Sequence, residues 1–202
     1  IGGGAIDSTL ATELASFPYA VWSTYGMTET LSHIALRRLN GPDASDWYTP
    51  FQGVKVSLSP ENTLTIEAPA VCAEKLTTND ICEFNAQGQF HILGRKDNTI
   101  NTGGVKVQIE QVENALKTAL SVPFMVTAVP DPKFGERIVL LLEDEGKTYT
   151  VELLNQALLK LPAYWRPKQV FHIQKLPQTE TGKPDRATAR KVAKEIAESE
   201  KK

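Results

Sequence analysis

The pattern of apolar positions divides the chain into two halves. Between residues 53 and 93, apolar side chains recur at every second position, and short runs of turn residues separate these stretches. Alternation of this kind predicts a small antiparallel β unit, either a sheet or a partial barrel. The alternating positions include Val54, Val56, Leu58, Leu64, Ile66, Phe90 and Ile92.

One short helix and one strand are predicted before this β unit. Asp7 or Ser8 can cap the helix, and Pro18 ends it because proline cannot continue the hydrogen-bond ladder. Residues 19–25 then have the pattern of a buried strand. Open α/β sheets place their ligand sites at the carboxyl ends of such strands, so the polar residues that follow become candidates for a site.

The second half alternates helical and strand patterns, which predicts a compact α+β unit of ~100 residues. Its predicted elements are a helix through 109–120, strands at 124–129 and 138–142, a helix through 151–161, a strand at 168–173 and a terminal helix from near Asp185. We therefore expect an α+β or α/β protein with domains at 1–96 and 97–202.

Composition narrows the classes of function. The formal net charge is -2, and no basic run precedes the very end, so nucleic acid is not an expected partner. Cys72 and Cys82 lack the paired spacing of a zinc site, and His33, His91 and His172 are scattered singly. No apolar run approaches the roughly 20 residues of a membrane span, so no membrane association is expected.

Residues 94–107 carry two glycine-bearing turns and a run of charges within a short stretch. This segment lies where the two-residue alternation gives way to helical spacing. We interpret it as a hinge between the two predicted domains.

The first of three polar stretches with recognisable chemistry is 25–29. The ring of Tyr25 could stack on a planar base, the hydroxyl of Thr28 could reach a phosphate, and the carboxylate of Glu29 could hold a magnesium ion that bridges phosphates. The same residues also fit an aromatic strand end followed by a helix cap, and they do not decide between the two.

The other two polar stretches, around Asp80 and around Lys183, could bind a sugar and stabilise negative charge, respectively. Asp80 could accept hydrogen bonds from both hydroxyls of a ribose, with Arg95 nearby as a donor, or it could be an ordinary turn residue. Lys183 follows Gly182 in a turn and would suit charge that builds up on a carboxylate and an α-phosphate, although most Gly-Lys pairs are surface turns.

The order of these motifs resembles the adenylate-forming superfamily, which includes acyl-CoA synthetases, peptide-synthetase adenylation domains and luciferases. The motifs, in order, are Y-G-M-T-E, T-N-D, G-R-K-D, L-P-A-Y-W-R-P and L-P-Q-T-E-T-G-K-P-D-R. The resemblance implies that 1–96 form the last part of a large AMP-binding domain, with a small β-sheet subdomain, and that 97–202 form a small mobile C-terminal domain. It also implies two reactions: ATP activates a carboxylate as acyl-AMP, and coenzyme A then displaces AMP.

The resemblance assigns roles to individual residues. It implies a nucleotide site made of Tyr25 and Gly26 at the adenine, Thr28 at the phosphates, Glu29 at magnesium, and Asp80 and Arg95 at the ribose. It further implies that Lys183 bridges the acyl carboxylate and the α-phosphate, that Asp97 is the pivot, and that Gly103 and Gly104 face the coenzyme A channel.

The sequence departs from the family pattern at three places. Val105 stands where the family's glycine turn commonly has an acid, which puts a carboxylate role there in doubt, and Gln178 replaces a lysine. The family's phosphate loop, rich in glycine, serine and threonine, is missing from the 202 residues. We therefore expect a fragment that does not adenylate any acid alone.

Within the superfamily, the sequence most resembles the o-succinylbenzoate-CoA ligases of menaquinone biosynthesis, which implies a bacterial, cytoplasmic enzyme. Gly3, Gly4, Ser32 and His33 are candidate contacts to the acyl substrate, and His33 could equally be a partly buried helix histidine. The alternatives are a fatty or aryl acyl-CoA synthetase, a carrier-protein-loading adenylation domain, or a non-catalytic module. The sequence leaves the oligomeric state open, with a homodimer as one option.

Overall fold

The computed structural model describes residues 1–2, 6, 8–117, 119–120, 122–143 and 151–200. The chain forms two compact units, Ile1–Lys96 and Asp97–Lys202. This break lies between the same two residues as the boundary drawn from the sequence. Among the described helices, none is long and apolar enough to cross a membrane.

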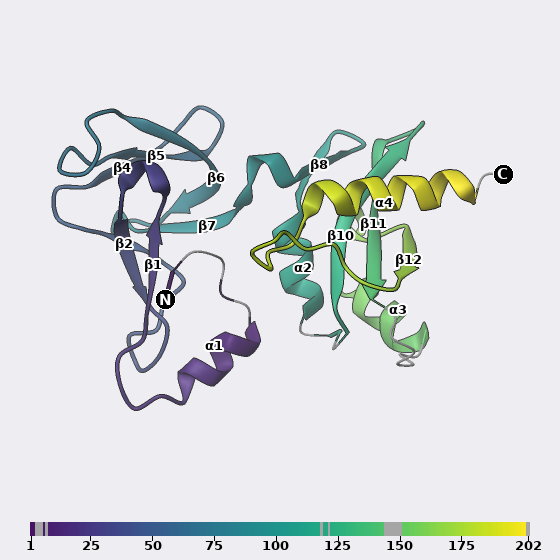
Figure 1. The fold of residues 1–202 in the computed structure, drawn as a ribbon, viewed down its shortest axis with the longest axis horizontal. Helices are drawn as coiled ribbons and strands as arrows, with labels where there is room; N and C mark the ends of the chain where they lie inside the picture. The colour runs from purple at the N-terminus through teal and green to yellow at the C-terminus, as the bar shows by residue number, and fades with distance from the viewer. Residues whose placement is uncertain (3–5, 7, 118, 121, 144–150, 201–202) are drawn as a thin grey trace. The chain divides into compact units, whose positions relative to one another are not determined.

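The first unit begins with helix α1 (Ser8–Ala15), followed by an antiparallel sheet of three strands (Figure 1). These strands are β1 (Trp22–Gly26), β2 (His33–Arg38) and β3 (Thr49–Pro50), with a 3-10 turn η1 (Thr28–Thr30) between the first two. Helix α1 matches the helix predicted from its cap and from Pro18. Strand β2 was not predicted, because its H-I-A-L-R-R sequence does not alternate.

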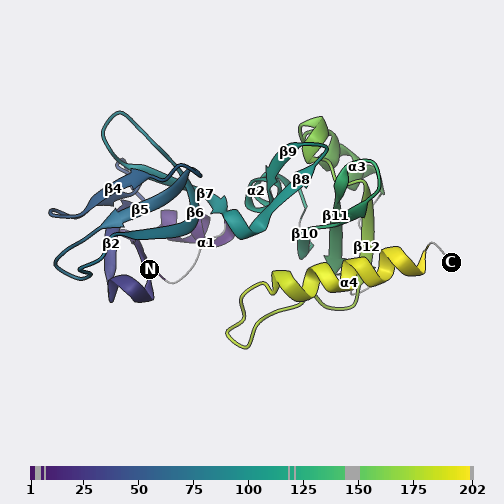
Figure 2. The ribbon, with the colours of Figure 1, turned by 90° about the horizontal axis from the view of Figure 1, so that it is seen from above.

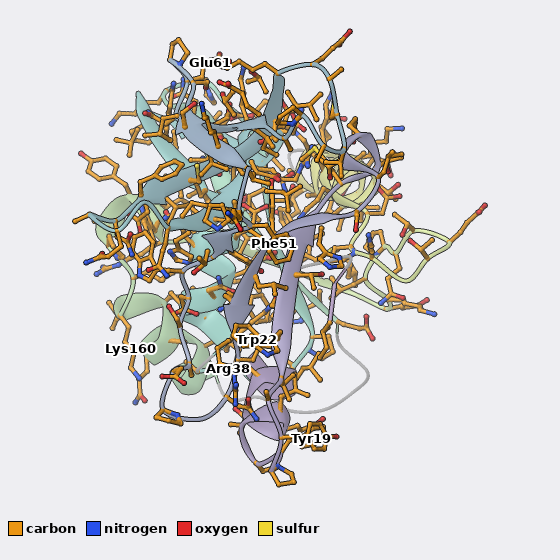
Figure 3. All side chains as sticks on the ribbon, turned by 90° about the vertical axis from the view of Figure 1, so that its left-hand side faces the viewer. Tyr19, Trp22, Arg38, Phe51, Glu61 and Lys160 are labelled. Atoms are coloured by element: carbon orange, nitrogen blue, oxygen red, sulfur yellow. The ribbon has the colours of Figure 1, made fainter. Side chains whose placement is uncertain are left out.

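The strand predicted over 19–25 is shorter and less buried than expected. It begins at Trp22, and Tyr19 is 62% exposed. The side chain of Asn40 accepts from the amide of Val21 and donates to the carbonyls of Phe17 and Tyr19, at 2.9–3.1 Å. For these three backbone groups, the side chain of Asn40 takes the place of a strand partner. The guanidinium carbon of Arg38 lies over the indole of Trp22, 5.4 Å from the ring centroid (Figure 3).

The second sheet of this unit is the antiparallel β unit predicted from the alternation. Its strand order is β4-β5-β6-β7, and its strands are β4 (Lys55–Leu58), β5 (Thr63–Glu67), β6 (Leu76–Phe84) and β7 (Phe90–Arg95). Leu64, Ile66 and Phe90 are fully buried and pack with Ile34 and Ala35 of β2, so the two sheets of the unit share one core.

The second unit is a five-stranded sheet covered by helices. Its elements are the 3-10 turn η2 (Lys96–Asn98), which spans the boundary, β8 (Thr99–Thr102), β9 (Val105–Gln108), α2 (Ile109–Lys117), β10 (Phe124–Asp131), β11 (Gly135–Glu143), α3 (Val151–Leu159), η3 (Ala163–Trp165), β12 (Gln169–Ile173) and α4 (Arg186–Ser199). The strand order is β10-β11-β8-β9, and β12 pairs in parallel with β11.

Strand β11 supplies apolar side chains to both faces of this sheet. Ile138, Leu140 and Leu142 pack against α2 and α3, whereas Val139 and Leu141 pack against the alanine face of α4. Figure 2 shows α4 on one side of the strands and α3 on the other. The helices and strands predicted for this half are confirmed, and most of the stretch 94–107 that we interpreted as a hinge belongs to the β8–β9 hairpin.

Candidate functional site

The Y-G-M-T-E motif occupies the end of β1 and the turn η1. A side chain at Gly26 would place its Cβ 2.5 Å from the carbonyl oxygen of Ser32, so glycine is required by this close backbone approach. The buried hydroxyl of Thr30 lies within hydrogen-bond distance of the amide and carbonyl of Met27, at 3.1 and 3.0 Å, and of the Ser32 carbonyl, at 2.7 Å. Thr30 thus holds the turn from within, and Thr28 and Glu29 in the same turn are exposed.

Asp80 lies at the centre of a polar group formed by three separate strands. The hydroxyl of Tyr25, in β1, donates to its Oδ2 at 2.6 Å. Arg95, in β7, donates from Nη1 to its Oδ1 at 3.2 Å and is its partner in the β6–β7 register. We call Tyr25, Asp80 and Arg95 the Asp80 cluster. Each carboxylate oxygen retains a lone pair for another donor, and the Asp80 side chain is 16% exposed.

Burial, and next the negative charge of Asp80, raise the pKa of the Tyr25 hydroxyl far above its ordinary value. The phenol therefore stays protonated and acts as a donor that orients Asp80. Burial, with smaller contributions from Asp80 and Glu83, also raises the pKa of the Cys82 thiol to about 12. Cys82 is thus a neutral core residue at physiological pH and not a nucleophile.

Two aromatic residues that the motifs did not identify support Tyr25. Its ring meets those of Tyr48 and Phe90 edge-on, with centroids 5.8 and 5.2 Å away. Tyr48 stacks on Phe90 at 5.5 Å, and the two residues exchange backbone hydrogen bonds of 2.7 and 3.1 Å. The alternation marked Phe90 as a core position, but no local pattern pointed to Tyr48.

The proposed acyl contacts are only partly described. Gly3 and Gly4 lie outside the described residues. Ser32 and His33 are exposed, and the His33 ring lies 5.7 Å from that of Phe51. His33 begins strand β2, so the alternative of a partly buried helix histidine is wrong.

The residues on either side of Asp97 are each held within their own unit. Lys96 Nζ lies 2.6 and 2.7 Å from the two carboxylate oxygens of Glu61, in the first unit. Asn98 donates to Glu110 Oε1 at 2.5 Å, in the second. Asp97 is the residue between these two side-chain contacts, at the start of the second unit.

Gly103 and Gly104 form the turn of the β8–β9 hairpin. Their φ angles are 61° and 83°, in the left-handed region that favours glycine. The amide of Gly103 donates to the carbonyl of Phe134 at 2.8 Å, which ties the hairpin tip to the β10–β11 connection.

Lys183 lies within an ordered turn that we call the Lys183 turn, residues 177–185. The amide of Thr179 donates to the Lys183 carbonyl at 2.8 Å, and the Lys183 amide donates to the Thr179 hydroxyl at 3.1 Å. Gly182 has a φ of 76° and completes the turn. The Lys183 side chain is exposed.

Together, the structure brings Tyr25, Asp80 and Arg95 into contact, and Gly26 directly follows Tyr25 in the sequence. Thr28 and Glu29 lie in the exposed turn beyond Gly26. Lys183, Gly103 and Gly104 belong to the second unit. Within the described part of the chain, no cluster of three or more His, Cys, Asp or Glu side chains could hold a metal ion by itself. The lone exposed carboxylate of Glu29 fits the way in which Mg²⁺ is usually held, by one or two carboxylates together with substrate phosphates.

No family model matches the sequence. Among curated proteins, 3-oxocholest-4-en-26-oate–CoA ligase of Rhodococcus rhodochrous is 38% identical over 109 residues, which cover 52% of this chain and 20% of that protein. The 2-succinylbenzoate–CoA ligase of Lactococcus lactis is 24% identical over 200 residues, covering 91% of this chain and 44% of that protein. The chain thus spans less than half the length of either relative.

Solved structures with the same fold include ATP-bound MatB from Rhodopseudomonas palustris, with a TM-score of 0.81, 22% identity, and coverage of 96% of this chain and 45% of that one. O-succinylbenzoate coenzyme A synthetase from Bacillus subtilis, in complex with ATP and magnesium ion, gives a TM-score of 0.76 at 20% identity, over 93% of this chain and 45% of that one. The mixed α/β fold expected from the sequence is confirmed.

Proposed function

We propose that this chain is the C-terminal portion of an AMP-forming acid–CoA ligase. The convergence of Tyr25, Asp80 and Arg95, which come from three different strands, is the observation that carries this proposal. Further support comes from the two relatives described above, which are acid–CoA ligases by name. The term complete ligase is used below for the longer protein, similar in length to these relatives, that would contain this chain.

In this proposal, the Asp80 cluster holds the ribose of ATP. Asp80 accepts from the two ribose hydroxyls while Tyr25 and Arg95 fix its carboxylate. Tyr25 and Gly26 border the adenine. Thr28 donates to a phosphate, and Glu29 binds a magnesium ion that would neutralise charge on the phosphates.

Lys183 acts in the first reaction. A carboxylate oxygen of the acid attacks the α-phosphorus, the bond to pyrophosphate breaks, and acyl-AMP and pyrophosphate are formed. Negative charge collects on the carboxylate and the α-phosphate as this happens. The ammonium of Lys183 stabilises that charge, and the Lys183 turn holds the lysine in position.

The second reaction needs a different arrangement of the same unit. The sulfur of coenzyme A attacks the acyl carbonyl, the carbon–oxygen bond to AMP breaks, and the thiol proton is released. We propose that the second unit turns about Asp97 between the reactions, which withdraws Lys183 and brings Gly103 and Gly104 to the pantetheine. A hinge of one or two residues is the usual basis of such a motion.

For the acid, we propose o-succinylbenzoate. The supporting observation is that similarity to 2-succinylbenzoate–CoA ligase extends over 91% of this chain, compared with 52% for 3-oxocholest-4-en-26-oate–CoA ligase. Ser32 and His33 are exposed polar groups beside the Y-G-M-T-E turn, where they could meet the second carboxylate of this acid.

The test measures thioester, AMP and pyrophosphate formed by the complete ligase from o-succinylbenzoate, benzoate and hexanoate. We expect kcat/KM for o-succinylbenzoate to be at least about 100-fold higher, because a site that hydrogen-bonds the second carboxylate of this acid leaves those groups unpaired with an acid that lacks it. Preference for hexanoate or benzoate would assign the enzyme to the fatty or aryl acyl-CoA synthetases. Absence of AMP formation with any acid would contradict the proposed reaction itself.

A further inference from the structure

Two arginines on one face of α4 bind carboxylates that none of the motifs identified. Arg186 and Arg190 are one helical turn apart, and they pair with Glu113 of α2 and Glu136 of β11. Each carboxylate also accepts a hydrogen bond from a backbone amide, so each pair connects α4 to a second and a third element.

Arg186 and Glu113 form a bidentate pair in a largely buried position. The distances are 2.5 Å from Nη1 to Oε1 and 2.7 Å from Nη2 to Oε2, and Glu113 is 9% exposed. Glu113 Oε1 also accepts from the amide of Val126, in β10, at 2.8 Å. Burial opposes the charge of Arg186, but the hydrogen bonds and charge of Glu113 outweigh it and raise the guanidinium pKa. The pair therefore fixes the first turn of α4 on α2 and β10.

The Lys183 turn is attached directly to that first turn of α4. Asp185 caps the helix, accepting from the amide of Thr188 at 3.0 Å and from its hydroxyl at 2.7 Å. The amide of Asp185 also donates to the carbonyl of Pro177 at 3.0 Å, which closes the base of the turn. The backbone of Lys183, three residues before Arg186, is thus held in place through the Arg186–Glu113 pair.

The second pair is attached to the other functional turn of this unit. Arg190 forms an ion pair with Glu136 Oε1, and Glu136 Oε2 accepts from the amide of Asn101 at 2.9 Å. Asn101 lies in β8, two residues before Gly103 in the turn of Gly103 and Gly104. Arg190 is half exposed, so this pair is weaker than the first.

We propose that Arg186 and Arg190 are positioning residues that serve different half-reactions. Arg186, through Glu113, positions Lys183 for acyl-adenylate formation, and Arg190, through Glu136, positions the Gly103–Gly104 hairpin for thioester formation. This inference rests on the proposed function for its catalytic consequence, whereas its structural content concerns the second unit alone.

The catalytic test uses the complete ligase with Arg186→Gln and Arg190→Gln. We expect Arg186→Gln to slow ATP–pyrophosphate exchange by about 100-fold, as a displacement of about 1 Å would do, and to leave thioester formation from supplied acyl-adenylate within about threefold of normal. We expect Arg190→Gln to slow only the second reaction, by about threefold to fivefold, as suits an exposed ion pair. Equal effects of each variant on both reactions would overturn the proposal.

Two further variants separate positioning from loss of folding. The double variant Glu113→Gln with Arg186→Gln leaves no unpaired buried charge and keeps an acceptor for Val126, and it should show the same selective loss of exchange activity. Lys194→Gln makes the same change of charge at an exposed pair with Glu198 on α4 and should leave both reactions unchanged. Normal exchange activity in the double variant would also overturn the proposal.

The structural test uses this 202-residue chain and requires no activity. We expect amide hydrogen exchange to become faster at 179–185 in the Glu113→Gln, Arg186→Gln variant and at 99–106 in Arg190→Gln, each without change at the other segment. Unchanged amide hydrogen exchange at both segments would contradict the positioning roles of the Arg186–Glu113 and Arg190–Glu136 pairs. If amide hydrogen exchange confirms both pairs but the wild-type complete ligase makes no acyl-adenylate, the proposed function fails and the structural assignment of the two pairs stands.

Discussion

Replacing Lys183 with alanine in the complete ligase is expected to slow acyl-adenylate formation by about 10³-fold. Removing one group that stabilises transition-state charge typically costs 10²–10³ in rate, and Lys183 would be the cation that the second unit supplies. Lys183 lies in an exposed turn, so little stability should be lost. The measurement is ATP–pyrophosphate exchange, in parallel with thioester formation from supplied acyl-adenylate, which should remain within a few-fold of normal.

Lys175 offers a matched control for this experiment. It is an exposed lysine eight residues earlier in the chain, outside the Lys183 turn. Lys175→Ala should leave both reactions unchanged. If Lys183→Ala slows ATP–pyrophosphate exchange by less than about fivefold, this lysine does not carry the first reaction.

Asp97→Pro is expected to reduce turnover of the complete reaction by about 100-fold while one half-reaction is largely retained. Proline fixes φ near -65° and restricts the preceding residue as well. Lys96 is held by Glu61 and Asn98 by Glu110, so the neighbouring residues are poorly placed to take over the rotation. The protein should therefore favour one arrangement, and the two half-reactions, measured separately, should be affected unequally.

The same substitution in an ordinary turn provides the control. Ala86 follows Asn85 in a turn closed by the bond from the Gly88 amide to the Asn85 carbonyl, 3.1 Å, and the second position of such a turn accepts proline well. Ala86→Pro should leave both half-reactions intact. Equal losses of the two half-reactions in Asp97→Pro would contradict the assignment of Asp97 as the pivot.

The sequence predicted best those elements whose pattern is local. The alternation through Leu64, Ile66 and Phe90 defined the β4–β7 sheet, and the spacing of Val112 and Leu116 defined α2, because one buried face imposes a fixed period. Strand β2 was missed because its burial depends on pairing with β1 and β3 and not on its own pattern. The early start predicted for β1 failed because the side chain of Asn40 replaces a strand partner there.

The candidate site was predictable as a set of residues but not as an arrangement. The motifs named Tyr25, Asp80 and Arg95, yet the hydrogen bonds among them depend on the β6–β7 register, which shifts between Ile81 and Cys82. The Arg186–Glu113 pair joins residues 73 positions apart, and neither belongs to a periodic pattern that would reveal its partner. Such contacts are set by the packing of helices on the sheet, which no short motif records.

The central claim, that a carboxylate is activated by transfer of AMP, is tested most directly with an isotope. The complete ligase is supplied with o-succinylbenzoate carrying ¹⁸O in its carboxylates, together with ATP and coenzyme A, and the AMP and pyrophosphate are analysed by mass spectrometry. Attack of the acid on the α-phosphorus followed by thiol attack on the carbonyl carbon places one ¹⁸O in each AMP and none in pyrophosphate. Unlabelled AMP, or label in inorganic phosphate, would contradict the reaction proposed for this protein.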